Sequence, residues 1–113
     1  TEPQYLKRLT VKTDDRVQFI NVQDIDTIEA AGNYAVVHVG KENHVLRETL
    51  TNLEGKLSPK QFMRVSRSAI VNLEQVKELQ PMFKGENVIV LKNGRHIPTT
   101  RSIREIQQHL ETL

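Results

Sequence analysis

The sequence contains no cysteine in its 113 residues. A disulfide bond, a thiolate metal ligand and a thiol nucleophile are therefore excluded, so the fold has to be stabilised by packing. No run of about 18 apolar residues occurs that could span a bilayer, and the first residues lack the basic and then apolar pattern of a signal peptide. These absences favour a cytoplasmic domain, and we expect it to need no metal or other cofactor.

Alanine is scarce at 4 residues, whereas Val and Ile together number 20 and Thr adds 9. Residues that branch at Cβ favour strands over helices. A helical bundle is therefore disfavoured. The length suits a single domain, because domains usually have about 100 to 200 residues.

Alternating apolar and polar residues predict short strands joined by hairpins. Asn93-Gly94 is the strongest turn signal, because a two-residue hairpin turn needs positive φ at both positions. The residues with β-type composition are 6–13, 16–20, 24–29, 34–39, 43–47, 63–72, 76–81, 87–92 and 95–98. We expect about nine or ten strands in antiparallel sheets.

Two segments have helical spacing instead. Three leucines recur at steps of three and four over residues 50–57, and Thr49 is available as their N-cap. A second helix is predicted from Ser102 to the end of the chain, where Glu105 follows Ser102 at capping-box spacing. The fold class is therefore mainly β with a short mid-chain helix and a C-terminal helix.

Charge is unevenly distributed along the chain, although the formal net charge is only +2. Residues 1–57 carry 7 Lys/Arg and 9 Asp/Glu, or −2, and residues 58–113 carry 9 Lys/Arg and 5 Asp/Glu, or +4. This asymmetry suggests an anionic partner for the C-terminal half. A solvated charged face is the commoner explanation of such a pattern.

The histidines and the short motifs favour no enzyme class. No phosphate-binding glycine loop, dinucleotide fingerprint, nucleophile elbow or zinc-protease helix occurs. His38 and His44 could approach each other across a hairpin, but no further ligand is spaced to complete a metal site. A small hydrolase that uses His38, His44 or His96 stays a remote third option.

Two stretches place arginine beside hydroxyl residues, at 62–72 and 93–101. An arginine fork can bind guanine O6 and N7 or a phosphate, and Ser and Thr can donate to phosphate oxygens. This chemistry suits DNA. The simpler interpretation places Arg64 and Arg67 on an exposed strand face and assigns Asn72 to an Asx-turn.

Aromatic residues are too scattered to form a stacking platform for single-stranded bases. They fall mostly at positions with the phase of a core, namely Tyr5, Phe19, Tyr34, Phe62 and Phe83. Binding of a single strand is therefore disfavoured.

An ordered set of motifs resembles the LytTR family of bacterial DNA-binding domains. The motifs are I-E-A-A-G-N-Y (28–34), R-E-T-L-T-N-L-E-G-K-L (47–57), F-M-R-V-S-R-S-A-I-V-N (62–72) and L-K-N-G-R-H-I-P-T-T-R (91–101). The resemblance covers residues 6–113, and we interpret residues 1–5 as a linker remnant. It implies an elongated stack of small antiparallel sheets that reads successive major grooves of DNA with loops.

The resemblance also implies a role and partners. We expect the effector domain of a two-component transcriptional regulator, excised from a chain whose N-terminal receiver domain is missing here. Its expected partner is double-stranded DNA with promoter direct repeats, on which monomers in solution would pair. The alternative from another class is a protein-interaction module that docks an acidic partner.

Family positions transfer to this sequence as two groups of candidate residues. The resemblance assigns base contacts to Asn33, Arg67 and Arg101. It assigns DNA-backbone contacts to Ser66, Ser68, Arg95, Thr99, Thr100 and Arg104.

Two departures from the family pattern affect these assignments. Ser66 stands where many relatives have a histidine, so a large donor is missing beside Arg67. Thr100 stands where serine is frequent, which preserves a hydroxyl before Arg101. For Tyr34 we expect a buried strand position in preference to a base contact.

Overall fold

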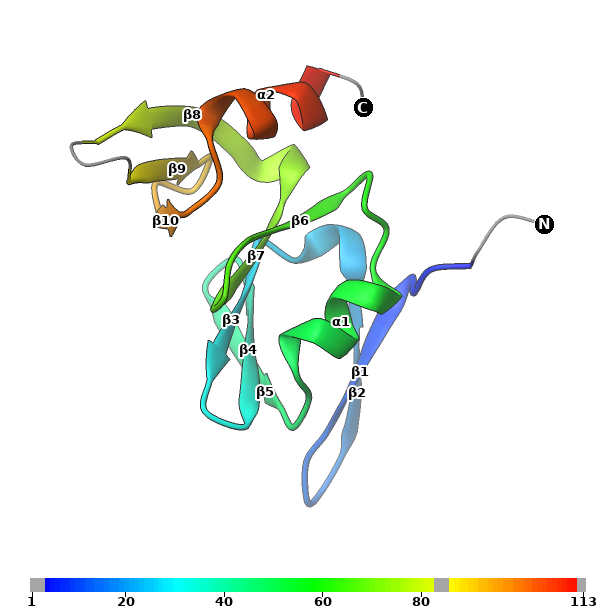
Figure 1. Cartoon of the computed structure of the whole chain (residues 1–113). Coiled ribbons are helices and arrows are strands. Elements are labelled where there is room, and N and C mark those ends of the chain that lie inside the picture. The colour runs from blue at the N-terminus through cyan, green and yellow to red at the C-terminus, as the bar shows by residue number, and fades with distance from the viewer. Residues whose placement is uncertain (1–3, 83–85, 112–113) are drawn as a thin grey trace.

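The computed structural model in Figure 1 describes residues 4–82 and 86–111. The α-helices are α1 (Leu50–Lys56) and α2 (Ile103–Glu111). The strands are β1 (Arg8–Lys12), β2 (Val17–Asn21), β3 (Thr27–Ala31), β4 (Tyr34–Val39), β5 (Glu42–Leu46), β6 (Phe62–Ser66), β7 (Ala69–Asn72), β8 (Val76–Pro81), β9 (Asn87–Leu91) and β10 (His96–Thr99). The predicted class of mainly β structure with two helices is confirmed.

The strands form three small sheets in which every pairing is antiparallel. β1 pairs with β2, the central sheet has the order β5-β4-β3-β7-β6, and the last sheet has the order β10-β9-β8. The sheets are stacked along the molecule, whose extents are 46 × 35 × 23 Å (Figure 1). The predicted elongated stack is therefore confirmed.

Three hairpin turns use glycine in the left-handed region of φ. Gly94 has φ +88° between β9 and β10, and Gly32 has φ +62° between β3 and β4. The Asn93 side chain also closes its turn, because its Oδ1 accepts from the backbone N–H of Arg95 at 2.9 Å. A turn at Asn93-Gly94 is confirmed, but the expected two-residue connection is wrong, because Arg95 lies opposite Leu91 and residues 92–94 link the strands.

Both predicted helix starts are confirmed. The Thr49 hydroxyl accepts from the N–H of Asn52 at 3.1 Å. The Ser102 hydroxyl accepts from the N–H of Glu105 at 3.1 Å. In a complete capping box the backbone N–H of Ser102 would also donate a hydrogen bond to the Glu105 carboxylate. That carboxylate contacts Arg101 instead.

The interior has two hydrophobic cores that share the β6–β7 hairpin. The N-terminal core comprises Leu9, Val11, Ile20, Val22, Ile25, Ile28, Ala35, Val37, Leu50, Leu53, Leu57, Phe62 and Ile70. The C-terminal core comprises Met63, Val65, Ala69, Val71, Leu73, Ile89, Leu91, Ile97 and Ile106. Because successive strand residues point to opposite faces, Ile70 belongs to the first core and its neighbours in β7 belong to the second.

Some expectations about individual residues are wrong. Phe19 is 64% exposed and Tyr34 is 48% exposed, so neither is a core residue. Both lie on strands with one face open to solvent, where the period-2 pattern does not tell which face is buried. The strand expected from residue 24 begins at Thr27, because residues 22–24 form a 3-10 turn. Phe83 lies outside the described residues.

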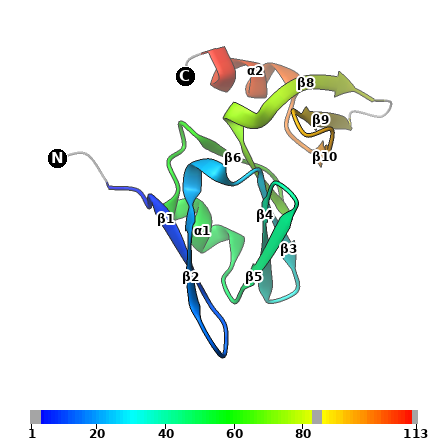
Figure 2. The same cartoon turned by 180° about the vertical axis from the view of Figure 1, so that it is seen from behind.

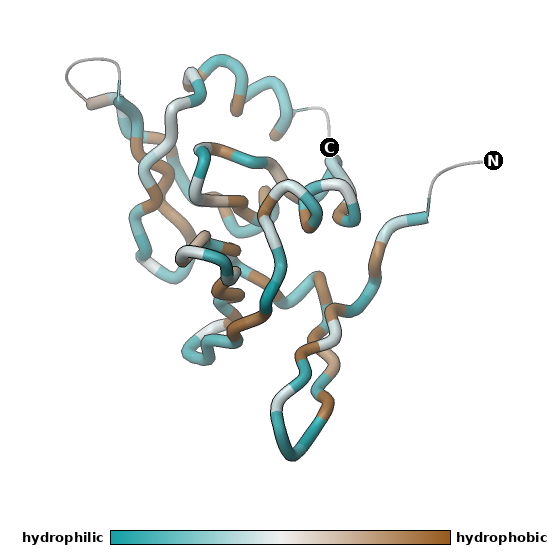
Figure 3. Tube along the Cα trace, turned by 60° about the horizontal axis from the view of Figure 1, so that its bottom comes forward, coloured by the Kyte–Doolittle hydropathy of each residue, from teal (hydrophilic) through white to brown (hydrophobic). Residues whose placement is uncertain are grey.

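Figure 3 shows the trace coloured by the hydropathy of each residue. The tip of the hairpin nearest the N-terminal end is hydrophilic, whereas its strands carry hydrophobic positions. Viewed from behind in Figure 2, α2 and β8–β10 form one end of the molecule and the β1–β2 hairpin extends toward the other.

Candidate nucleic-acid interface

The structure places all three predicted base-contacting residues on exposed connections. Asn33 lies in the turn between β3 and β4, Arg67 in the turn between β6 and β7, and Arg101 between β10 and α2. None of the three is buried. The side chains could therefore reach a ligand outside the protein.

Backbone hydrogen bonds join these three connections side by side. The N–H of Ala30, at the end of β3, donates to the carbonyl of Ser68 at 2.9 Å. The N–H of Thr100 donates to the carbonyl of Val65 at 3.0 Å. The β6–β7 turn therefore lies between the other two connections, and all three follow one side of the molecule (Figure 1).

An open depression brings the second and third connections together. Its volume is about 400 Å³, and it is lined by Arg64, Ser66, Arg67, Thr100, Arg101 and Glu105. Three guanidinium groups and one carboxylate thus surround it, which makes it suitable for an anionic or hydrogen-bond-accepting ligand. Asn33 is not part of this depression.

Arg64 holds the turn that carries Arg67. Its Nη2 donates to the carbonyl of Arg67 at 2.8 Å and its Nε donates to the carbonyl of Ser66 at 3.2 Å. Its Nη1 also donates to Thr51 Oγ1 of α1 at 3.0 Å. The Arg67 side chain itself has no hydrogen-bond or ion-pair partner among residues 4–82 and 86–111. Arg64 thus fixes the backbone of the turn, while the guanidinium group of Arg67 is available to bind a ligand.

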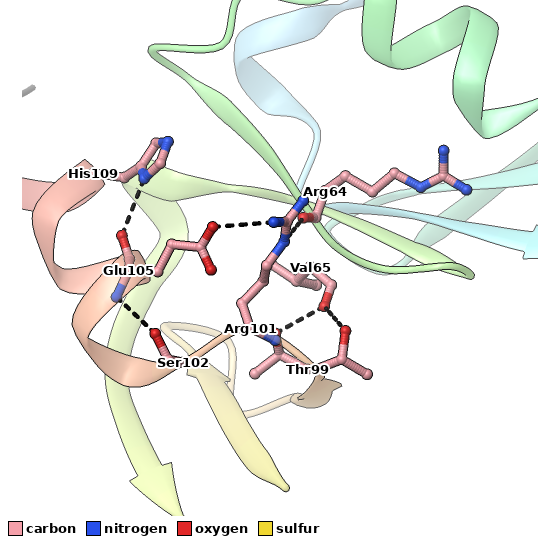
Figure 4. Close-up of polar contacts among 8 residues, drawn as sticks. Arg64, Val65, Thr99, Arg101, Ser102, Glu105 and His109 are labelled. Atoms are coloured by element: carbon pink, nitrogen blue, oxygen red, sulfur yellow. Dashed lines mark hydrogen bonds and ion pairs between the residues drawn. The ribbon is translucent and has the colours of Figure 1, made fainter. Parts of the chain in front are cut away.

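Arg101 is held differently, as Figure 4 shows. Its Nε donates to the carbonyl of Arg64 at 3.2 Å, and its Nη1 lies 3.0 Å from Glu105 Oε1. The Arg101 side chain nevertheless stays 44% exposed. Arg64 therefore contacts both predicted base-reading segments, one through its side chain and the other through its carbonyl.

Four of the predicted backbone-contacting residues are accessible in varying degree. Ser68 and Thr100 are exposed, and Ser66 is half-buried with its hydroxyl accepting from the N–H of Ser68 at 3.2 Å. Arg104 is exposed on the first turn of α2, and within the described part of the chain its side chain has no partner. All four remain predictions.

The positions of Thr99 and Arg95 do not support a contact with DNA. Thr99 is 3% exposed, and its hydroxyl donates to the carbonyl of Val65 at 2.8 Å. Arg95 is half-buried, donates to Thr27 Oγ1 at 3.0 Å and forms an ion pair with Glu29. Both side chains join β10 and its turn to the central sheet, which is why they are turned inward.

Sequence reasoning missed two polar residues, of which Arg64 shapes this region and Asp26 contacts the β4–β5 turn instead. Arg64 was expected on an exposed strand face, but its side chain is only 22% exposed because a register shift between Arg64 and Ser66 turns it toward the β6–β7 turn. Asp26 is buried and accepts from the N–H of Gly40 at 2.9 Å. A polar residue flanked by Ile25 and Thr27 was the available signal for Asp26.

The histidines form local pairs. His38 Nδ1 lies 2.7 Å from Asn43 Oδ1, and His44 Nε2 lies 3.4 Å from Glu42. Among the described residues, no three His, Asp or Glu side chains gather as a metal site would require. No helix in residues 4–82 and 86–111 has the length and apolar character to cross a bilayer.

Comparison with known proteins identifies the fold first. A solved LytTr DNA-binding domain from Bacillus cereus superimposes with a TM-score of 0.80 at 22% identity, covering 93% of this chain and 97% of that one. The profile of the LytTr DNA-binding domain matches residues 15–111. The chain therefore belongs to the LytTR family, which is a family of DNA-binding domains and not of enzymes.

Two relatives are longer proteins, which this chain matches over part of their length. The sensory transduction protein LytT of Bacillus anthracis is 30% identical over 97 residues, which cover 86% of this chain and 39% of that protein. The transcriptional regulatory protein LytR of Staphylococcus aureus strain N315 is 30% identical over 94 residues, which cover 83% and 38%. The chain thus spans about two fifths of the length of these relatives.

Proposed function

We propose that this domain binds double-stranded DNA in a sequence-specific manner as the effector domain of a two-component transcriptional regulator, downstream of a receiver domain. The observation that carries the proposal is the alignment of three exposed connections along one side of the molecule, joined by the Ala30–Ser68 and Thr100–Val65 bonds. The family membership and the names of the relatives support it.

Base reading is assigned to the three exposed side chains. Arg67 and Arg101 meet guanine in one major groove segment, since an arginine fork matches O6 and N7. Asn33 reads adenine from the β3–β4 turn, which lies next to the β6–β7 turn that carries Arg67. The long axis of 46 Å exceeds the roughly 34 Å of one helical turn of DNA, so the domain is long enough to meet successive major grooves.

Phosphate contacts flank these side chains. Ser66 and Thr100 offer hydroxyl groups at the edge of the depression, Ser68 offers one in the β6–β7 turn, and Arg104 adds a charge on α2. Such contacts fix the orientation of a protein on the duplex without reading its sequence. Thr99 holds the protein framework in this proposal, because its hydroxyl is buried and bonded to Val65, and Arg95 joins β10 to β3 through Thr27 and Glu29.

Selection of bound duplexes from a random library, followed by anisotropy titrations on the selected site, tests the proposal. We expect Arg67→Ala and Arg101→Ala each to cost about 1–3 kcal/mol of binding free energy on that site. Arg16→Ala is the matched control, because Arg16 lies in the β1–β2 turn and pairs with Asp15. Unchanged affinity in both test variants would remove the base-reading assignment.

Arg104→Ala separates phosphate contacts from base contacts. We expect it to weaken the selected site and random duplex alike and to reduce the salt slope by about one unit. A loss confined to the selected site would mean that Arg104 reads bases. Failure of the unmodified domain to bind heparin or any duplex would favour the protein-interaction alternative.

The proposal includes pairing of two copies on direct repeats. Sedimentation should show a monomer without DNA and two domains on a duplex that carries both repeats. A tight dimer in the absence of DNA would contradict this part of the proposal.

A further inference from the structure

The Glu105 carboxylate does not accept the capping-box hydrogen bond from the Ser102 N–H that its position in α2 would allow. Glu105 is the third residue of α2, the acidic position of the capping box, and its backbone N–H donates to the Ser102 hydroxyl at 3.1 Å. Its carboxylate is not returned to Ser102, because Oε1 lies 3.0 Å from Arg101 Nη1 (Figure 4). The helix start thus directs a negative charge at a predicted base-reading arginine.

This contact leaves the Arg101 guanidinium anchored and still able to bind. A guanidinium has five N–H groups. Arg64 takes the one on Nε and Glu105 takes one on Nη1, so three stay open, including both on Nη2. Two are enough for the paired contact to guanine. The two protein acceptors therefore restrict the orientation of the head group without exhausting its donors.

The ion pair contributes little to folding stability. Its two side chains are 44% and 41% exposed, and solvent screens the attraction of an exposed pair. We therefore expect a change at Glu105 to alter the affinity for DNA and to leave folding stability almost unchanged. Its carboxylate lines the depression beside Arg101, whereas the other nearby carboxylate, that of Glu54, lies 3.5 Å from Arg64 Nη1 and is not part of the lining.

A negative charge at this place acts differently on phosphates and on bases. Phosphates carry full charge and are attracted by all three arginines on any DNA sequence. A carboxylate among these arginines lowers that general attraction. The acceptor atoms of guanine are uncharged, so the carboxylate opposes their contact with Arg101 far less.

We propose that Glu105 is a specificity-determining residue, which orients Arg101 for base reading and discourages contacts of Arg101 with phosphate. This inference rests on the proposed function, because it requires Arg101 to read a base. It gives an acidic residue among the arginines a role in favouring contacts with bases over contacts with phosphates.

The test compares affinities for the selected site and for random duplex at one salt concentration. We expect Glu105→Ala to lower the ratio of the two affinities about fivefold to tenfold, through weaker site binding and stronger random binding. Glu105→Gln keeps an acceptor for Arg101 and removes the charge. It should strengthen binding to random duplex while site affinity is retained.

Glu111→Gln is the matched control on the same helix. It removes the same charge, and Glu111 contacts Gln107 at 2.9 Å instead of an arginine. We expect it to leave the affinity ratio unchanged. Thermal unfolding of each variant checks that the domain stays folded during the titrations.

Combining Glu105→Ala with Arg101→Ala shows whether Glu105 acts through Arg101. We expect Glu105→Ala to have no effect on the ratio once Arg101 is absent. The same loss in both backgrounds would overturn the inference, and so would an unchanged ratio in the Glu105 variants while Arg101→Ala weakens the site. If Arg101→Ala has no effect on site affinity, the base-reading assignment of Arg101 fails first and the role of Glu105 fails with it.

Discussion

The N-terminal and C-terminal cores share one hairpin but carry different surfaces. The N-terminal core lies beneath α1 and the β1–β2 hairpin, whereas the C-terminal core lies against α2 and the β8–β10 sheet (Figure 1). The arginines of the depression gather where the two cores meet, at the β6–β7 turn and the start of α2. Of the three connections, only the one with Asn33 joins strands whose buried apolar residues lie in the N-terminal core alone.

This difference indicates how firmly each candidate contact is placed. The β6–β7 hairpin has residues in both cores, so the turn with Arg67 is fixed by packing on two sides. Arg64 adds bonds from that turn to α1. The strands of the Asn33 turn are also paired with β7 and β5, but the turn extends past the bond of Ala30 to Ser68 and has no such side-chain support from any residue that the structure describes. Disturbances of the shared hairpin should therefore change binding more than disturbances of the Asn33 turn.

The largest expected effects come from cavities in the two cores. We expect Leu53→Ala in the N-terminal core and Leu91→Ala in the C-terminal core each to lower the free energy of unfolding by about 2–5 kcal/mol. Both side chains are fully buried. Because the cores share a hairpin, urea unfolding followed by circular dichroism should show one transition in each variant. Two separate transitions would show that the cores fold independently, and exposed Val45→Ala is the control.

Removing the Arg64 side chain should have the next largest effect. We expect Arg64→Ala to lower site affinity about tenfold, because it releases the carbonyls of Ser66 and Arg67 from their donors and loosens the turn. Hydrogen exchange should increase at the amides of residues 66–69 and stay unchanged in β1 and β2. Arg64→Lys cannot replace the fork and should bind weakly too. Retention of full affinity would show that Arg67 needs no such support.

Local pattern predicted most elements because their signals are local. Thr49 and Ser102 cap their helices, and Asn93-Gly94 forms its turn, as steric and hydrogen-bond preferences near each residue require. The Asx-turn at Asn72 is also confirmed, since its Oδ1 accepts from the N–H of Glu74 at 3.0 Å. These features depend on neighbours within three residues.

The site was less predictable because its contacts join distant segments. Arg95 bonds Thr27, 68 residues away in sequence, and Arg101 bonds the carbonyl of Arg64, 37 residues away. No pattern near Arg95 distinguishes it from Arg67, yet one is turned inward and the other is open. Composition identifies which residues could contact DNA, and packing of the sheets decides which of them can reach it.

A substitution in the Asn33 turn tests the connection that we expect to contribute less to DNA binding than the β6–β7 turn. We expect Asn33→Ala to cost about 1 kcal/mol on the selected site, at the lower end for an adenine contact, because the turn is less firmly placed. The loss should disappear on a duplex in which the adenine is replaced. Asn43→Ala is the control, because Asn43 lies on β5 and bonds His38. A loss as large as that of Arg67→Ala would show that the two regions contribute equally.

The smallest effect concerns α1 alone, where Glu48 precedes the helix. Hydrogen bonding from Asn52, together with the nearby Lys56, lowers the pKa of the Glu48 carboxyl below its ordinary value of 4.5. The unfolded chain then binds the proton more readily, so the stabilisation is complete above about pH 4.5 and is lost as the pH falls through the lower folded pKa. Because the group is near solvent, we expect it to contribute no more than about 0.5 kcal/mol to the free energy of unfolding.

Urea unfolding tests this prediction. The free energy of unfolding of Glu48→Gln should differ from that of the unmodified domain at pH 7 and approach it in acid. A difference that persists below pH 3, roughly a unit and a half under the ordinary value, would assign the effect to packing of α1 and not to the charge.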